Sequence, residues 1–159
     1  PKEIGLCFAF VGVAAAFTQT FITGPMAERF GPGAMLAVGM TITLIGQALQ
    51  PFSFHPGMVI ALMCLTAIGQ SVAWPNVSAL ISETAPPDRQ GQILGLNNAM
   101  GAAARVAGPF CAGLSFAHVS LDGPFILGAI IVAPSIWLAV IAARRAQAWR
   151  EAQTGKTPE

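Results

Sequence analysis

Long apolar segments separated by short polar ones dominate the hydrophobic pattern of this chain. No Asp, Glu, Lys or Arg occurs between Arg29 and Glu83, and Leu, Ile, Val and Ala fill most of that interval. An α-helix needs about twenty apolar residues to cross the hydrocarbon core of a bilayer. The pattern predicts five membrane-spanning helices, at residues 4–23, 33–50, 57–82, 91–117 and 124–143.

Continuous apolar runs distinguish these segments from the strands of a membrane barrel, which alternate apolar and polar residues over about ten positions. We therefore expect an all-α fold, a polytopic membrane helix bundle over residues 1–146. The third and fourth spans exceed twenty residues, so we expect them to tilt or to extend past the membrane. Residues 147–159 are expected to form a tail.

Composition supports a membrane protein and excludes several other classes. Hydrophobic residues make up 54% of the 159 residues, whereas charged residues make up 9%, against about a quarter in soluble domains. So few charges cannot cover the surface of a soluble enzyme. The chain is too apolar to be disordered, and it lacks the basic stripe that binding of nucleic acid requires.

The distribution of Lys and Arg predicts the orientation. One side of the predicted bundle holds six cations and the other holds one, Lys2. The positive-inside rule therefore places the C-terminus in the cytoplasm, with the bundle in the plasma or inner membrane. An odd number of spans, an outside start and no initiator Met lead us to expect a piece of a longer chain. The six cations are Arg29, Arg89, Arg144, Arg145, Arg150 and Lys156.

The link between the first two spans carries a motif, with Gly24, Glu28, Arg29 and Gly31 at fixed spacing. Glycine permits a tight reversal and close helix approach, so we expect Gly24 and Gly31 to form the turn, with Glu28 and Arg29 at helix ends. A simple charged turn is the alternative. The link resembles the Gly-x-x-x-Asp-Arg/Lys-x-Gly loop of the major facilitator superfamily, with Glu28 in place of Asp and the trailing basic pair absent.

The fourth span carries a second motif. Gly95, Gly108, Pro109 and Gly113 match the antiporter motif of the same superfamily, which occurs in its fifth helix and more weakly in the eleventh. The resemblance implies that the five spans are helices eight to twelve, within the drug and metabolite efflux branch driven by proton exchange. The N-terminal half would then lie outside this sequence.

Small residues repeat every four positions along the fourth span, which favours close helix packing in lipid. Pro109 removes a backbone donor and is expected to bend the helix. This arrangement suits a rocking interface and a static bundle equally. The repeat consists of Gly91, Gly95, Ala99, Ala103 and Ala107.

Arg105 is the candidate that stands out for the transport pathway, because it is the charge well inside a predicted span. A charge at that depth costs about 2.5–3.5 kcal/mol on insertion scales, so it should face a cavity, a partner or water. Asn98 lies seven residues earlier, on almost the same helical face. A structural or gating role for Arg105 remains an alternative to direct contact with solute.

The third span offers Gln70, Trp74 and Asn76 near its midpoint, next to Pro75. An amide, an indole and a proline kink suit the lining of a mixed polar cavity, although interhelical hydrogen bonding is an equal alternative. Gln19 and Gln47, nearer span ends, are weaker candidates.

We expect a secondary transporter that moves a small organic solute by alternating access, without a cofactor or metal. Any coupling proton would need a carrier elsewhere, because these spans contain no carboxylate. The alternatives are a non-transporting membrane scaffold, which needs no polar residues at mid-depth, and an intramembrane enzyme, which needs a nucleophile and base or metal ligands. His55 and His118 lie outside the spans, and the cysteines show no metal or redox spacing.

Overall fold

The computed structural model describes residues 2–118 and 122–154, and 93% of these described residues are helical, with no strand among them. The predicted all-α class is therefore confirmed. The helices are α1 (Lys2–Phe17), the π-helix η1 (Thr18–Thr23), α2 (Gly24–Phe30), α3 (Pro32–Leu49), the 3-10 helix η2 (Gln50–Phe52), α4 (Pro56–Thr84), α5 (Gln90–His118) and α6 (Gly123–Thr154).

Four segments of the described chain are long and apolar enough to cross a membrane. Helix α5 is not among them, although its 29 residues exceed the length that a bilayer requires. Its hydropathy is lowered by Arg105, two asparagines and many small residues. The four segments are Ala9–Phe30, Pro32–Phe52, Pro56–Thr84 and Gly123–Ala148.

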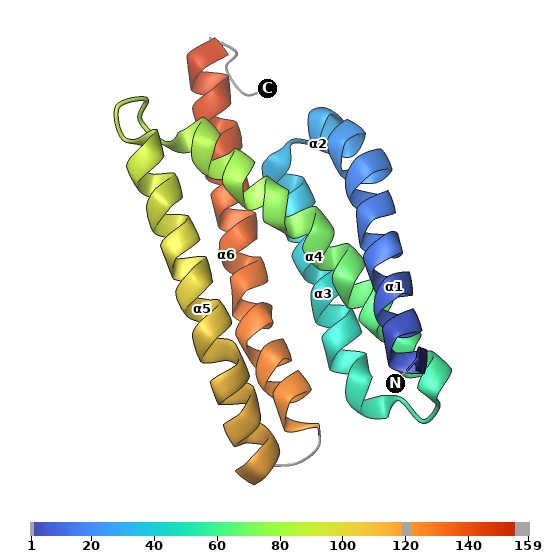
Figure 1. The fold of residues 1–159 in the computed structure, drawn as a ribbon. Coiled ribbons are helices and arrows are strands. Elements are labelled where there is room, and N and C mark those ends of the chain that lie inside the picture. Colours follow the sequence, from blue (N-terminus) through green and yellow to red (C-terminus); the bar gives the residue numbers. More distant parts are fainter. Residues whose placement is uncertain (1, 119–121, 155–159) are drawn as a thin grey trace.

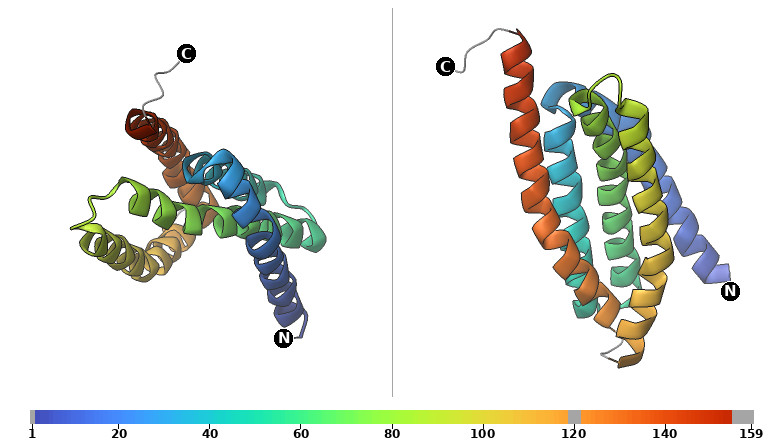
Figure 2. Two further views of the ribbon diagram at one scale, coloured as in Figure 1. Left: turned by 90° about the horizontal axis from the view of Figure 1, so that it is seen from above. Right: turned by 90° about the vertical axis from the view of Figure 1, so that its left-hand side faces the viewer.

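The helices run up and down along one general direction and form a bundle (Figure 1). Helix α4 crosses over α3, with α1 on one side and α5 on the other. Two further views show that α1 begins near the end of the bundle opposite to the end where α6 finishes (Figure 2).

The most closely packed part of the bundle consists of α3, α4 and α6. Leu36, Leu80, Ala139 and Ala146 form its buried apolar cluster. Helix α5 lies apart from this core, since no described residue of α5 is buried. Large apolar side chains are exposed on most helices, as expected for surfaces that face lipid or other parts of a membrane protein.

Glycines allow α3 and α4 to touch backbone to backbone. A Cβ atom at Gly39 would lie 2.7 Å from both the Ala73 nitrogen and the Gly69 carbonyl oxygen. A Cβ atom at Gly69 would lie 2.6 Å from the Thr43 nitrogen. Thr43 satisfies its own hydroxyl by donating to the Gly39 carbonyl oxygen at 3.0 Å. Close packing through small residues is thus a feature of α3 and α4.

The structure corrects the predicted link between the first two spans. Gly24 is helical, with φ −60° and ψ −65°, and α2 continues to Phe30. Only Gly31 turns the chain, with φ 82° and ψ 154°. The prediction of a reversal at Gly24 is therefore wrong. Pro25 is tolerated because it lies at the start of α2, and the residues after it are good helix formers.

A π-helical turn over Thr18–Thr23 was not predicted. Pro25 has no backbone N–H, so the carbonyl group of Phe21 loses its usual α-helical donor. Within the turn, the Thr23 hydroxyl donates to the Thr18 carbonyl oxygen at 3.2 Å, and the Thr18 hydroxyl donates to Ala14 at 2.8 Å. The two hydroxyl groups therefore give hydrogen bonds to backbone carbonyl oxygens where the helix departs from regular α-helical hydrogen bonding.

Helix α6 continues through Thr154, past the span boundary predicted at residue 143, so the predicted tail begins inside a helix. Lys156 of the predicted tail and the middle of the predicted loop at 117–123 lie outside the described residues. The side chains of Lys2 and Arg150 also lie outside the described part.

Candidate functional site

Two residues predicted separately, Arg105 and Trp74, form a pair between neighbouring helices. The guanidinium carbon of Arg105 on α5 lies 5.2 Å from the ring centroid of Trp74 on α4. A cation over the face of an indole at this distance makes a cation–π contact, worth about 0.5–1 kcal/mol when exposed and about 2 kcal/mol or more when desolvated. Trp74 is 45% exposed, and Arg105 is also exposed.

Gly101 makes room for this pair. A Cβ atom at Gly101 would lie 3.2 Å from Cη2 of Trp74 and 4.0 Å from an Arg105 terminal nitrogen. The indole therefore lies against the backbone of α5, one helical turn before Arg105. Sequence analysis did not single out Gly101, because the need for a small residue there arises only from contact with another helix.

The side chains of α5 divide into polar and apolar lines. At about 100° per residue, Asn98 lies within about 20° of the direction of Arg105. Leu96, Phe110 and Leu114, all exposed, lie roughly opposite, about 140–180° away. A helix built this way can turn its large apolar side chains to lipid while Arg105 and Asn98 face protein or water.

The structure places the remaining pathway candidates differently. Gln70 is exposed on α4, one turn before Trp74, whereas Asn76 is only 2% exposed. The Asn76 amide nitrogen donates to the Val72 carbonyl oxygen of its own helix at 2.7 Å. Gln19 is exposed on the π-helical turn η1.

Glutamine side chains from three elements gather at a second place, around a cavity of about 220 Å³. Gln70 from α4 and Gln47 from α3 both line it, together with the buried Gln50 of η2. Sequence analysis treated Gln47 and Gln70 as unrelated candidates and overlooked Gln50. The complete lining is Gln47, Gln50, Met63, Thr66, Ala67, Gln70 and Phe125.

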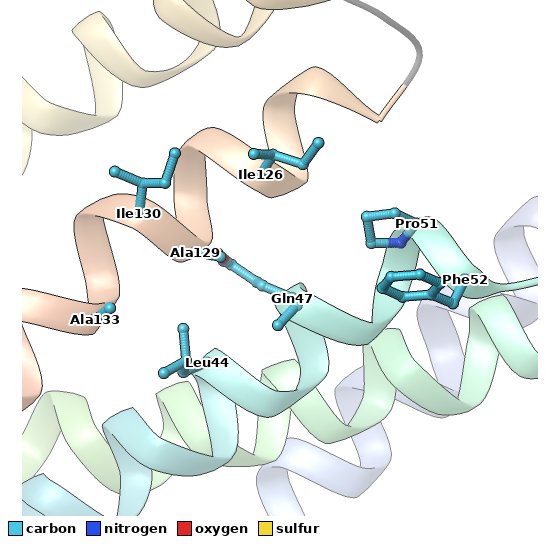
Figure 3. Close-up of a pocket in the computed structure, with 9 residues that line it drawn as sticks. Leu44, Gln47, Pro51, Phe52, Ile126, Ala129, Ile130 and Ala133 are labelled. Atoms are coloured by element: carbon cyan, nitrogen blue, oxygen red, sulfur yellow. The ribbon is translucent and has the colours of Figure 1, made fainter.

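Gln47 also borders a larger apolar cavity of about 410 Å³ between α3 and α6, where its side chain extends toward Ala129 (Figure 3). Its Oε1 atom is buried without a hydrogen-bond partner in the described part of the chain. Gly128 lies against it so closely that a Cβ atom there would collide with the amide. The other lining residues are Leu44, Ala48, Pro51, Phe52, Ile126, Ala129, Ile130 and Ala133.

The loop motif and the packing motif have few contacts in the described structure. Arg29 stacks its guanidinium 5.7 Å from the Phe30 ring centroid, and Glu28 is exposed. A Cβ atom at Gly95, Gly108 or Gly113 would meet nothing within 4 Å. Pro109 lies inside a continuous α5. The small-residue face of α5 is therefore open among the described residues.

No group of His, Cys, Asp and Glu in the described ranges is arranged to hold a metal ion. Asp88 and Arg89 form an ion pair, 3.5 Å apart, in the exposed α4–α5 connection. Nearby, the Gln90 amide donates to the Ser82 carbonyl oxygen at 2.7 Å.

Comparisons with known proteins connect this arrangement to a family. The model of the Major Facilitator Superfamily matches residues 1–159. The chain is 30% identical over 149 residues to the class C tetracycline resistance protein of Escherichia coli, covering 94% of this chain and 37% of that protein. The class G tetracycline resistance protein of Vibrio anguillarum is 31% identical over 106 residues, covering 67% of this chain and 27% of the relative.

The similarity extends to an animal protein. The Hippocampus abundant transcript 1 protein of Homo sapiens is 27% identical over 123 residues, covering 76% of this chain and 25% of its own length. The chain thus spans about a quarter to somewhat over a third of these relatives. No solved structure matches it at a significant level.

Proposed function

Because the chain belongs to the major facilitator superfamily, we propose that it forms part of a secondary transporter that moves a small organic solute across a membrane. Homologues in this family are transporters, so no enzymatic activity is expected. Transport would occur by alternating access, with two helical halves rocking around a central site. This chain would supply helices eight to twelve, and the rest of the protein would supply helix seven and the N-terminal half.

The observation that carries this proposal is the Arg105–Trp74 pair. A membrane scaffold has no need for a guanidinium at the middle of a helix, where turning it to lipid costs about 2.5–3.5 kcal/mol. Here the guanidinium lies against an exposed indole on the neighbouring helix. Asn98 lies on almost the same face of α5 as Arg105, and Gln70 lies one turn before Trp74 on α4. We propose that these residues also line the solute pathway.

Efflux driven by proton exchange is the most specific form of the proposal. It is supported by the similarity to two tetracycline resistance proteins. The described spans hold no carboxylate between Glu28 and Glu83 or between Asp88 and Asp122. The proton carrier would therefore belong to the N-terminal half. The excess of Arg and Lys at one end supports a cytoplasmic C-terminus.

Flux through everted membrane vesicles containing the full-length protein tests this proposal, with tetracycline as the first solute. We expect uptake that an imposed pH gradient drives and that a protonophore abolishes. We expect the Arg105→Ala variant to lose at least about tenfold in flux, equivalent to roughly 1.4 kcal/mol of lost stabilisation.

The matched control is Arg89→Ala, which also removes one positive charge but does so in an exposed connection. We expect its flux to match that of the unaltered protein. Unchanged flux in Arg105→Ala at normal expression would contradict a role for Arg105 in the pathway. A panel of uncharged, anionic and cationic solutes without any gradient-driven flux would contradict transport itself.

A further inference from the structure

The charge on Arg105 has no acidic partner within the membrane-spanning part of this chain. Asp and Glu are absent from residues 89–121, so α5 itself offers none, and α4 carries Glu83 only in its last turn. An isolated charge inside a membrane protein is stabilised only by an opposite charge, dipoles or water. An anion that balances Arg105 would therefore come from outside these helices.

The geometry of the pair leaves the guanidinium ready for an anion. The Arg105 guanidinium carbon lies over the Trp74 ring, 5.2 Å from its centroid, and no N–H of that guanidinium has a hydrogen-bond or ion-pair partner among the described residues. Those N–H groups form a planar fork that matches a carboxylate bidentately. The exposed part of the indole, beside that fork, offers a flat apolar surface.

The outer surface of the pair is open among the described residues, since Trp74 is 45% exposed and Arg105 is exposed. The indole lies against the α5 backbone at Gly101. Because Gly101 has no side chain, it does not cover the rest of the indole surface. A flat aromatic group could stack there with a centroid separation of about 4.5–7 Å.

We propose that Trp74 and Arg105 form a subsite for aromatic organic anions, in which Arg105 binds a carboxylate and Trp74 stacks against the adjoining ring. This inference rests on the proposed transport function and names the class of its solute. Carboxylate and ring must be close together in the ligand, because the guanidinium and the indole are in contact. Arg105 would select solutes by their negative charge, and Trp74 would select them by their flat ring.

Equilibrium binding to the purified full-length protein in detergent tests the subsite without requiring transport. The probes are 2-naphthoate, uncharged 2-naphthamide and cationic 2-naphthylmethylammonium, which share one ring system. We expect 2-naphthoate to bind at least about tenfold more tightly than the amide, because charge-assisted hydrogen bonds are about twice as strong as neutral ones. The cation should bind most weakly.

Four variants separate the contributions of Arg105 and Trp74 to naphthoate binding. Arg105→Gln should abolish the preference for the carboxylate over the amide, while Arg105→Lys should retain part of it. Trp74→Leu should weaken naphthoate and naphthamide by a similar factor, while Trp74→Phe should retain most of the affinity. Arg89→Gln and Trp137→Leu are the controls, since each makes the same change at an exposed position on another part of the chain.

The outcomes distinguish this inference from the proposed function. Equal binding of naphthoate and naphthamide, no measurable naphthoate binding, or a carboxylate preference that survives in folded Arg105→Gln protein would overturn the subsite. Tetracycline flux in the same preparation would then leave transport standing. A carboxylate preference that depends on Arg105, without flux of any solute, would uphold the subsite and contradict transport.

Discussion

Replacing Gly31 by alanine should destabilise the protein, although the same change at Gly24 should not. Gly31 has φ 82° and ψ 154°, a region of backbone space that is essentially restricted to glycine and that costs another residue about 1–3 kcal/mol. Gly24 has ordinary helical angles, and a Cβ atom there would meet nothing within 4 Å.

The surrounding hydrogen bonds prevent Gly31 from relaxing to other angles. Its N–H donates to the Ala27 carbonyl oxygen at 2.9 Å, and its own carbonyl accepts from the Met35 N–H at 3.2 Å. Moving φ to a negative value would break the junction between α2 and α3. Alanine at Gly24 should instead gain up to about 1 kcal/mol of helix propensity. The two variants should therefore differ by about 1–4 kcal/mol in the free energy of unfolding.

Unfolding of the full-length protein by SDS titration in mixed micelles, followed by circular dichroism, measures this difference. Both glycines belong to one motif, so membership of the motif alone would predict similar losses of stability. If Gly31→Ala is as stable as Gly24→Ala, the assigned backbone conformation at Gly31 and the reasoning built on it are wrong.

Two further changes test the packing of α3. Gly39→Ala should lower the free energy of unfolding by about 1–3 kcal/mol through overpacking, because its Cβ would lie 2.7 Å from two backbone atoms of α4. Gly57→Ala should be neutral or stabilising by up to about 1 kcal/mol, because a Cβ there meets nothing within 4 Å. Equal effects in the SDS titration would refute the close contact. Gln47→Met should raise the free energy of unfolding by about 1 kcal/mol, because it removes a buried carbonyl oxygen without a hydrogen-bond partner. A large loss of stability instead would reveal a partner for Gln47.

The sequence predicts the number, order and type of the main helices because bilayer thickness imposes one strong length requirement on apolar segments. Charged residues lie in or beside three of the four predicted links, and the second, at 51–56, is marked by its two prolines. The residues at which the helices begin and end are less predictable. The predicted turn at Gly24 became helix because Met26, Ala27 and Glu28 favour helix and Pro25 is compatible with a first turn.

The site is predictable in its members but not in its contacts. Arg105 is conspicuous because a charge inside an apolar run is expensive, and Trp74 is conspicuous for its place beside Pro75. Their pairing depends on the rotation and vertical offset of α5 against α4, which the hydrophobic pattern does not encode. The close α3–α4 contact through Gly39 and Gly69 was missed for the same reason, since either helix alone shows only scattered glycines.

Gly101 shows how one small residue links helix packing to recognition. Small residues in membrane helices are usually taken to let two backbones approach. At Gly101 the approaching group is the Trp74 indole, 3.2 Å from where a Cβ would lie, and Arg105 follows four residues later on the adjoining face. A Cβ atom at that position would require the indole to shift by a few tenths of an ångström, and a larger side chain would require a greater shift. The small residue Gly101 of α5 therefore permits the contact that brings the Trp74 indole next to the Arg105 guanidinium.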